Sequence, residues 1–393
     1  MRVEDNKNTS FICFGGEDWW YKNRGHIDMQ LMRRFARLGT TLYVNSIVMQ
    51  KPNFKKATGG GRSFSEKFIR KTKSILMGLQ KVSTGFWVYS PLSIPAHHIG
   101  WLKTLNEIIL RLQLSTVIRK LRMHDPVIWV ACPAACEVAI KMKKSKLVYQ
   151  RTDRFEEYPN VDSKTIQQYD QKLKANADLT IFVNNKLYAE EANQCRKSLY
   201  LDHGVDFEKF AFAEKDPNIL SDMVNIPKPI IGYFGAIDSH SVNIALATKI
   251  AELLPEMSFV YVGTVSSDCS ELTAKRNVWM LGQKDYEEIP HYGKCFDVAI
   301  LPWIQNRWTE AANPIKVKEY LALGKPFVST PVFTQIQEYL DVAYVAETPE
   351  EFADCIKKAL SEDNPERITA RRKKVEKDTW NSKADRILCE LFE

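Results

Sequence analysis

Short apolar runs that alternate with helical patterns constrain the fold of this chain more than any other feature. In the first half the runs lie at 11–14, 41–44, 86–89, 127–130, 146–149 and 179–183, with helical patterns such as 27–38 and 101–121 between them. A strand that is apolar on both faces must be covered on both faces, and helical crossovers provide that cover in parallel sheets. The pattern predicts an α/β fold with a doubly wound sheet.

A second set of strands and helices begins at residue 230. The strands are expected at 230–235, 258–263, 278–280, 298–301 and 326–330, and the helices at 242–254, 350–360 and 380–392. Residues 207–229 mix charged residues with three prolines, which is typical of a linker. We therefore expect an N-terminal domain (1–206), a linker (207–229), a C-terminal domain (230–377) and a last helix (378–393) that packs back toward the N-terminal domain.

Ligands of open parallel sheets bind just beyond the carboxyl ends of the strands. Two such domains would place a cleft between two sets of strand ends, so functional residues are expected on loops that follow strands. The composition, with 45% hydrophobic and 26% charged residues, is that of a soluble globular protein. No uncharged run approaches the roughly 20 residues that span a bilayer, and no signal-peptide pattern opens the chain, so we expect a cytoplasmic protein.

Eight cysteines are spread along the chain without a CxxC pair. A zinc site has no support in this spacing, and buried reduced thiols are the simpler interpretation. We expect no cofactor and a metal-independent activity.

The net charge of +7 is concentrated in one segment. Residues 51–81 contain nine Lys or Arg and one acid, which leaves −1 for the rest of the chain. Within residues 64–80, apolar positions recur at helical spacing, and the basic residues Lys67, Arg70, Lys71 and Lys73 occupy much of the remainder. A cationic amphipathic helix of this kind binds anionic membrane surfaces. The alternative is a helix packed on the core with solvated lysines, and nucleic-acid binding is not expected because no binding motif accompanies the charge.

The stretch from Asn313 to Thr330 is the most informative local pattern. Asn313 is a good N-cap, Pro314 suits the first helical position, and Gly324 suits the residue after the last turn. The pattern predicts a short helix over 314–323 whose amino end, with free amides and a positive dipole, suits a phosphate.

Two charged side chains add to that site. Lys316 lies in the first turn, and Glu319 follows at i+3 on nearly the same face. A carboxylate in this position could accept hydrogen bonds from two ribose hydroxyls. The alternative is an ordinary surface helix with a lone Lys–Glu pair.

Six motifs in order carry a family resemblance: FGGEDWW (14–20), NRGHIDMQLMRR (23–34), YQRTDRF (149–155), DHGVD (202–206), GYFGAID (232–238) and NPIKVKEYLALGKP (313–326). With them the chain resembles GT-B glycosyltransferases of bacterial surface-polysaccharide synthesis, above all the teichuronic-acid type, and more distantly the xanthan glucuronosyltransferase. The resemblance implies two Rossmann-like domains and transfer of a sugar from a nucleoside diphosphate sugar, expected to be a UDP sugar, to a lipid-linked or glycan acceptor. A peripheral position at the inner face of the cell membrane follows from that acceptor and the basic segment.

The resemblance also assigns donor-binding residues. It places the diphosphate on Lys316 and the ribose on Glu319, within the motif that includes Asn313, Pro314 and Ile315. It places the base against backbone groups of Gly282, Gln283 and Lys284, with Tyr286 nearby, although an ordinary loop is an equal alternative. Gly235 belongs to the glycine turn after the first strand of the second domain.

The chain departs from the family at two points. Many GT-B enzymes have a second glutamate eight residues before the ribose-binding one, where this chain has Ala311 with Glu310 beside it. The Arg and Lys that often follow the glycine turn are also missing. Lys316 is therefore expected to be the main cationic phosphate ligand, and the stereochemical outcome stays open.

Asp153 is the candidate general base for the acceptor hydroxyl. It follows a strand, and it resembles the catalytic aspartate of the xanthan enzyme in its Tyr-x-x-x-Asp context. The alternative is an aspartate paired with Arg151 or Arg154. His26 and Asp18, which follow the first strand, are rival candidates.

Residues around the first glycine pair complete the predicted site. Gly15 and Gly16 would let the donor phosphate or the acceptor approach the backbone closely. Trp19, Trp20 and Arg24 are interpreted as an acceptor-binding loop, with core packing of the tryptophans as the alternative. The segment 203–206 is expected to shape a hinge.

Two other functions share the predicted fold. A catalytically inactive GT-B protein could serve as a binding or scaffold subunit, although Lys316, Glu319 and Asp153 favour an enzyme. A sugar-nucleotide epimerase would need a set of carboxylates and histidines that the sequence does not provide.

Overall fold

A computed structural model describes residues 8–21, 24–47, 64–93 and 100–393, with only the backbone for 64–68. The chain forms two compact units. Unit 1 contains the described residues before 55, Phe64–Asp202 and Asn381–Glu393, and unit 2 contains His203–Trp380. Each unit has its own sheet, and each is described by itself.

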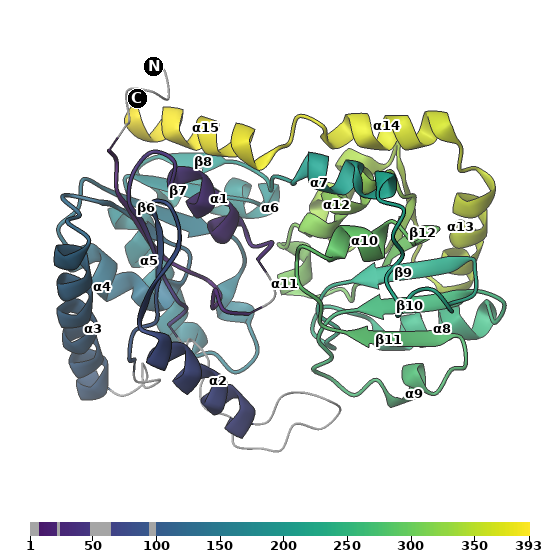
Figure 1. Ribbon diagram of the computed structural model, residues 1–393, viewed down its shortest axis with the longest axis horizontal. Helices are drawn as coiled ribbons and strands as arrows, with labels where there is room; N and C mark the ends of the chain where they lie inside the picture. The colour runs from purple at the N-terminus through teal and green to yellow at the C-terminus, as the bar shows by residue number, and fades with distance from the viewer. Residues whose placement is uncertain (1–7, 22–23, 48–63, 94–99) are drawn as a thin grey trace. The chain divides into compact units, whose positions relative to one another are not determined.

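Unit 1 is built on an eight-stranded sheet with the order β3-β4-β2-β1-β5-β6-β7-β8. Figure 1 labels β6, β7 and β8 of this sheet. Every neighbouring pair is parallel except the edge pair β3–β4, which is antiparallel. The strands are β1 (Phe11–Phe14), β2 (Thr41–Val44), β3 (Leu79–Ser83), β4 (Phe86–Tyr89), β5 (Val127–Val130), β6 (Lys146–Arg151), β7 (Leu179–Phe182) and β8 (Ser198–Tyr200).

Helices cover both faces of this sheet. Ile12 and Phe14 of β1 face a core that includes Leu114 and Leu173, whereas Phe11 stacks on Phe35 at 4.7 Å between ring centroids. Both faces of β1 are thus buried, which is why its sequence is apolar throughout. The helices are α1 (Ile27–Phe35), α2 (Phe64–Met77), α3 (Gly100–Lys120), α4 (Cys136–Lys141), α5 (Ser163–Asn176), α6 (Asn185–Glu191) and α15 (Trp380–Phe392).

Unit 2 contains a six-stranded, fully parallel sheet with the order β11-β10-β9-β12-β13-β14. The strands are β9 (Ile230–Phe234), β10 (Ser258–Val262), β11 (Val278–Gly282), β12 (Val298–Leu301), β13 (Phe327–Ser329) and β14 (Ala343–Val345). The helices are α7 (Phe207–Ala211), α8 (Ile244–Leu253), α9 (Ser270–Thr273), α10 (Ile289–Gly293), α11 (Arg307–Glu310), α12 (Ile315–Leu323), α13 (Pro349–Ser361) and α14 (Pro365–Val375). The two doubly wound sheets confirm the predicted fold class.

The segment 207–229 is more ordered than the linker that its composition predicts. It contains α7 and belongs to unit 2. Phe210, Met223 and Ile226 are buried in the core of that unit, so the apolar residues outweigh the three prolines. The part of unit 1 that precedes this segment ends at Asp202, four residues before the predicted boundary at 206.

No helix in the described ranges is both long enough and apolar enough to cross a bilayer.

Gly232, in the middle of β9, tests how tightly unit 2 is packed. A Cβ at this position would lie 2.1 Å from a ring carbon of Phe296, so Gly232→Ala must displace that ring. Overpacking of this kind costs about 1–3 kcal/mol. We expect a lower midpoint of denaturant unfolding for Gly232→Ala. Gly16→Ala is the control, because its nearest neighbour would be 3.8 Å away, and equal midpoints would contradict the packing argument.

Candidate functional site

Helix α12 carries the residues that were predicted to hold a nucleotide. It begins at Ile315, and Pro314 is itself the N-cap, with φ −73° and ψ 108°. The prediction that Asn313 is the N-cap and Pro314 the first helical residue is therefore wrong by one residue. The backbone of Pro314 is extended, so Pro314 precedes the first turn. Gly324 ends the helix as predicted, with a left-handed φ of 78°.

Lys316 lies in the first turn of α12, beside two aromatic rings. Its Nζ donates to the Tyr233 hydroxyl at 3.1 Å, and it lies 4.7 Å from the Tyr233 ring centroid and 5.2 Å from that of Trp303. Gly235 makes room for this ammonium group. Its φ is 140°, and a Cβ there would lie 2.6 Å from Nζ. The predicted glycine turn thus positions the predicted cation.

Glu319 is buried one turn further on, with 4% of its surface exposed. Its Oε1 has no hydrogen-bond partner among the described residues. Loss of hydration raises the pKa of Glu319 to about 7, although Tyr286 and Lys316 nearby act in the opposite direction. A buried acceptor without a partner is costly, and a ligand hydroxyl would satisfy it.

The loop after β11 provides backbone more than side chains. Gly282 ends the strand with φ 71°, and its carbonyl accepts from Gly263 at 2.9 Å. The ammonium group of Lys284 binds Asp222 at 2.6 Å, so this side chain already has an ionic partner. Tyr286 is buried beside Glu319, with its hydroxyl 3.5 Å from Asp206 Oδ2.

Lys318 lies between these two ligand candidates but faces the protein. It is 2% exposed, and its Nζ donates to the His203 carbonyl at 2.8 Å and to Asp378 Oδ2 at 2.7 Å. Val205 pairs with Thr379 in a parallel bridge beside these contacts. The first and last segments of unit 2 are thus joined to each other and to α12.

Asp153 follows β6 in unit 1 and is partly buried. Tyr158 donates to its Oδ2 at 3.0 Å. Loss of hydration raises the pKa of Asp153 to about 6, and the opposing effects include the charge of His26. The charge of His26, in the segment after β1, thus acts on the pKa of Asp153, in the segment after β6.

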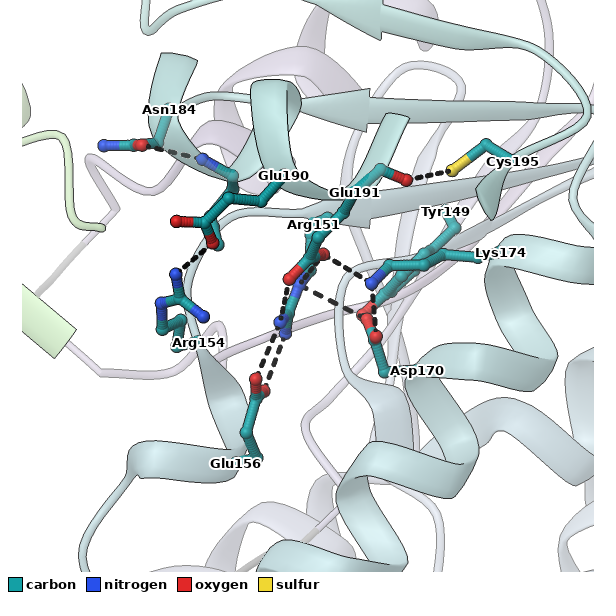
Figure 2. A network of polar contacts seen from close by, with 11 residues as sticks. Tyr149, Arg151, Arg154, Glu156, Asp170, Lys174, Asn184, Glu190, Glu191 and Cys195 are labelled. Atoms are coloured by element: carbon teal, nitrogen blue, oxygen red, sulfur yellow. Dashed lines mark hydrogen bonds and ion pairs between the residues drawn. The ribbon is translucent and has the colours of Figure 1, made fainter. Parts of the chain in front are cut away.

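The arginines on either side of Asp153 bind other carboxylates (Figure 2). Arg151 is fully buried, and it contacts Glu156 at 2.9 Å, Glu191 at 3.1 Å and Asp170 at 3.3 Å. Lys174 pairs with Asp170 and Glu191. Arg154 binds Glu190. Neither arginine is thus paired with Asp153 in the part of the chain that the structure describes, which argues against the alternative that Asp153 is their ion-pair partner.

Asp18 and Trp19 have structural contacts that do not suit the predicted roles. Asp18 is buried, where it accepts from Ser74 at 2.8 Å and from the Trp20 amide at 3.1 Å. Trp19 is 2% exposed, with its ring 4.7 Å from that of Phe86. Core packing therefore describes Trp19, since a sugar cannot stack on a buried ring.

The remaining residues of this loop divide between internal bonds and surface. The Gly15 amide donates to the Val44 carbonyl and the Gly16 amide to the Asp28 carboxylate. Neither amide is therefore available to the donor phosphate that the sequence pattern predicts near these glycines. The half-buried Trp20 indole binds Ser90 at 3.2 Å. The Arg24 guanidinium lies 5.8 Å from the Trp19 ring centroid.

The basic residues of α2 are less available to a membrane than the sequence predicts. Lys71 donates to the Ser46 carbonyl at 2.8 Å, and burial lowers its pKa. The Arg70 guanidinium lies 3.3 Å from the centroid of the Tyr21 ring. Lys73 is exposed, and the Lys67 side chain lies outside the described residues. Short-range partners, which helical spacing does not reveal, account for the difference.

Three aromatic residues of the site were not predicted. Tyr233 and Trp303 surround Lys316, and Tyr158 binds Asp153. Tyr233 could have been found, because it lies two residues before Gly235 on the strand and so shares its face. The spacing of Trp303 and Tyr158 carries no such signal. The described residues offer no group of three or more metal-ligating side chains, and metal independence stays a prediction.

Solved structures with the same architecture define the class of protein. Sucrose-phosphate synthase from Thermosynechococcus elongatus matches with a TM-score of 0.68 and 14% identity, over 98% of this chain and 99% of that one. HepE from Anabaena, in complex with UDP and glucose, matches with a TM-score of 0.67 and 14% identity, over 98% and 100%. The Escherichia coli trehalose-6-phosphate protein bound to UDP-2-fluoro glucose gives a TM-score of 0.65 and 13% identity, over 98% and 99%. The fold is GT-B.

Residues 228–362 match the family model described as Glycosyl transferases group 1. This part of the chain, which includes α12 and the β9 and β11 loops, is a group 1 glycosyltransferase domain. TuaH of Bacillus subtilis strain 168, named as a teichuronic acid biosynthesis glycosyltransferase, is 29% identical over 191 residues. That match spans 46% of this chain and 47% of TuaH, about half of each.

Replacing the buried guanidinium should destabilise unit 1 strongly. Arg151→Met keeps most of the side-chain volume but removes the cation that Glu156, Asp170 and Glu191 share (Figure 2). Asp170 and Glu191 keep their contacts with Lys174. Breaking a buried ion pair by removing one partner costs about 3–5 kcal/mol. Arg154→Met is the matched control. Its partner Glu190 is 42% exposed, so we expect a cost of about 1 kcal/mol or less. Equal unfolding free energies for the two variants would refute this account.

Proposed function

We propose that this chain transfers a sugar from a nucleoside diphosphate sugar, with UDP as the nucleotide, to a lipid-linked or polysaccharide acceptor in cell-surface glycan synthesis. The observation that carries the proposal is that α12 has a cation in its first turn and, one turn on, a buried carboxylate oxygen with no hydrogen-bond partner in the described parts of the chain. The group 1 domain and the TuaH match agree with it.

The amino end of α12 suits the diphosphate. The amides of a first helical turn have no intrahelical acceptors, and the helix dipole adds partial positive charge. Lys316 supplies a full charge, held between Tyr233 and Trp303, close to the end of β9. As the sugar departs, the leaving diphosphate gains negative charge, and a fixed ammonium group stabilises it without reorganisation.

Glu319 suits the ribose. It follows Lys316 by three residues, about 4.5 Å along the helix axis. Its Oε1 needs a donor, and a ribose hydroxyl would provide one. The raised pKa of the carboxyl means that ligand binding and loss of the proton are coupled: a ribose hydroxyl donates to the carboxylate form.

Uridine is favoured as the base by the complexes of structurally similar proteins. HepE is described with UDP, with UDP and glucose, and with UDP-glucose. The loop at Gly282 offers backbone groups for such a base. The identity of the donor sugar stays open. Where many GT-B enzymes have a glutamate near the donor sugar, this chain has the small, buried Ala311 instead.

Asp153 is proposed as the base that takes the proton of the acceptor hydroxyl. With a pKa of about 6, it is largely ionised near neutral pH yet basic enough to accept a proton. His26 is the second candidate, and Asp18 is less suitable because Ser74 and the Trp20 amide occupy its oxygens. Trp20 and Arg24 remain proposed acceptor contacts.

We place the protein at the cytoplasmic face of the cell membrane, as a peripheral protein. A lipid-linked acceptor would be presented there, and the charge of the chain favours an anionic surface. The reaction as proposed needs no metal, because Lys316 and the helix end supply the positive charge.

Lys316→Ala should abolish measurable transfer and weaken UDP binding by at least tenfold, because the main phosphate cation is lost. Calorimetric titration with UDP measures the affinity. Lys325→Ala, which removes a nearby lysine paired with Glu214, is the control and should bind UDP normally. Wild-type UDP affinity in Lys316→Ala would remove the phosphate assignment.

Asp153→Asn should leave UDP binding intact and lower turnover by about 100-fold or more. At saturating donor the bound ribose keeps Glu319 ionised, so kcat reports the groups that titrate in the complex. The acid form of Asp153 cannot accept a proton, so kcat of the wild type should fall about tenfold per pH unit below pH 6. The variant should lose this acidic limb. Near-normal turnover in Asp153→Asn, or an unchanged acidic limb, would point to His26 or to another group.

A further inference from the structure

Helix α3 of unit 1 exposes a stripe of large apolar side chains. Trp101, Leu105, Ile108 and Leu112 are 69%, 40%, 48% and 65% exposed. They recur at i, i+4, i+7 and i+11, which places them on one side of the helix. The side that includes Leu110 and Leu114 is buried in the core of unit 1. Apolar residues therefore occupy two sides of this helix, and one of them has no cover within unit 1.

Neighbouring segments extend this apolar surface. Leu92 is 54% exposed, and both its amide and its carbonyl bond to the Gln113 side chain on α3, at 3.0 and 2.9 Å. Leu76 and Met77, at the end of α2, are 80% and 40% exposed. The next residue, Gly78, accepts from the Ser90 amide at 3.3 Å. Hydrogen bonds thus connect the exposed residues of α2, the loop after β4 and α3.

A basic cavity of about 460 Å³ lies at the other end of α3. Five of its lining residues are cationic and one, Asp125, is acidic. The cationic ones are Arg111, Arg119, Arg122, Lys141 and Lys143. Lys143 pairs with Asp125 at 3.0 Å, and Lys141 binds Glu107 at 2.7 Å. Arg119 and Arg122 have no carboxylate within 4.0 Å in the described part of the chain.

The cavity is separate from the proposed reaction site. Its lining includes Pro126, just before β5, and Met142, between α4 and β6. It therefore lies at the amino ends of these strands, whereas Asp153 follows the carboxyl end of β6. Arg122 and Asp125 in its wall have left-handed backbones, with φ of 53° and 40°. Such conformations in residues other than glycine are uncommon and concentrate at functional positions.

A single partner that binds both the stripe and the cavity must offer an apolar surface and anionic groups. Arg111, Ser115 and Arg119 follow each other at helical spacing on α3, beside the apolar stripe, and Arg122 lies just past the end of the helix. An anionic bilayer offers an apolar interior for the stripe and lipid phosphates for the guanidinium groups. A second copy of this chain, which carries a net charge of +7, would cover the stripe but would bring a second cationic cavity instead of an anion for Arg119 and Arg122.

We propose that α3 is a membrane-docking element: its apolar stripe enters the bilayer interface, and the basic cavity binds the headgroup phosphate of an anionic lipid. This inference rests on the proposed function only for the peripheral membrane location. It uses none of the residues assigned to the donor or to proton transfer. It also moves the main membrane contact away from the basic residues of α2, since Lys71 and Arg70 have internal partners.

The test measures binding of the full chain to vesicles. Co-sedimentation is followed with vesicles of equal parts phosphatidylglycerol and phosphatidylcholine, and with phosphatidylcholine alone. One variant combines Leu105→Ser with Ile108→Ser, and another combines Arg119→Gln with Arg122→Gln. The matched controls are Leu253→Ser with Leu340→Ser, and Lys357→Gln with Arg386→Gln, all at exposed positions elsewhere.

We expect each α3 variant to bind the anionic vesicles about tenfold more weakly than the wild type, while its control binds normally. Phosphatidylcholine vesicles should bind the wild type at least tenfold less than the anionic ones. UDP affinity should stay unchanged in all variants, because the proposed UDP site lies in unit 2. Unchanged far-UV circular dichroism and an unchanged unfolding midpoint then show that unit 1, which carries the α3 substitutions, is folded. If the wild type does not bind UDP, the proposed function is overturned, whereas the vesicle measurements still test the docking proposal.

Three results would overturn the proposal. The first is unchanged vesicle binding in both α3 variants. The second is a wild-type dimer in sedimentation velocity that the stripe variant converts to monomer without any change in vesicle binding, which would identify a second copy as the occupant. The third is tight binding of inorganic phosphate that needs Arg119 and Arg122 while vesicle binding does not, which would identify a free anion.

Discussion

The ion pairs of the buried Arg151 guanidinium are the interaction on which the segment around Asp153 in unit 1 depends. The guanidinium joins the last residue of β6 to Glu156 in the following loop and to Asp170 and Glu191 on two helices. Asp153 lies between Arg151 and Glu156 in the sequence, so this ion pair holds together the two ends of the short polar loop that contains Asp153. The opposing charges offset much of the desolvation cost, because the guanidinium can bond several carboxylates in one plane.

In unit 2, one helix, α12, positions the corresponding set of buried and half-buried charged residues. Three nearby residues of α12 face different surroundings: Lys316 lies between aromatic rings, Glu319 is buried beside Tyr286, and Lys318 binds the segments at both ends of the unit. Glycine at 235 is needed because Lys316 occupies the place of a side chain. The geometry of the proposed nucleotide site is therefore set mainly by close packing around a helix end.

The sequence predicted what depends on periodicity and missed what depends on side-chain partners. Continuous apolar runs identified both sheets, because strands buried on two faces leave that pattern. The pattern on α12 predicted a short helix with Lys316 in its first turn and Glu319 one turn on, and the helix begins one residue later than predicted. Their ligand roles stay predictions. Trp19 could not be distinguished from Trp20, since the turn geometry after β1 decides which ring is buried. The exposed side of α3 was invisible for a related reason: apolar residues recur on more than one side of this helix, so spacing alone does not reveal which side the core covers.

The contacts of Lys318 have a consequence for motion. Its ammonium group holds the residues at which the chain enters and leaves unit 2, and it does so from the helix whose neighbouring side chains are proposed to bind the nucleotide. A ligand that shifts α12 must therefore carry these two segments with it or break their bonds. Donor occupancy and the conformation at the unit boundary are then linked variables, so each can be read by measuring the other.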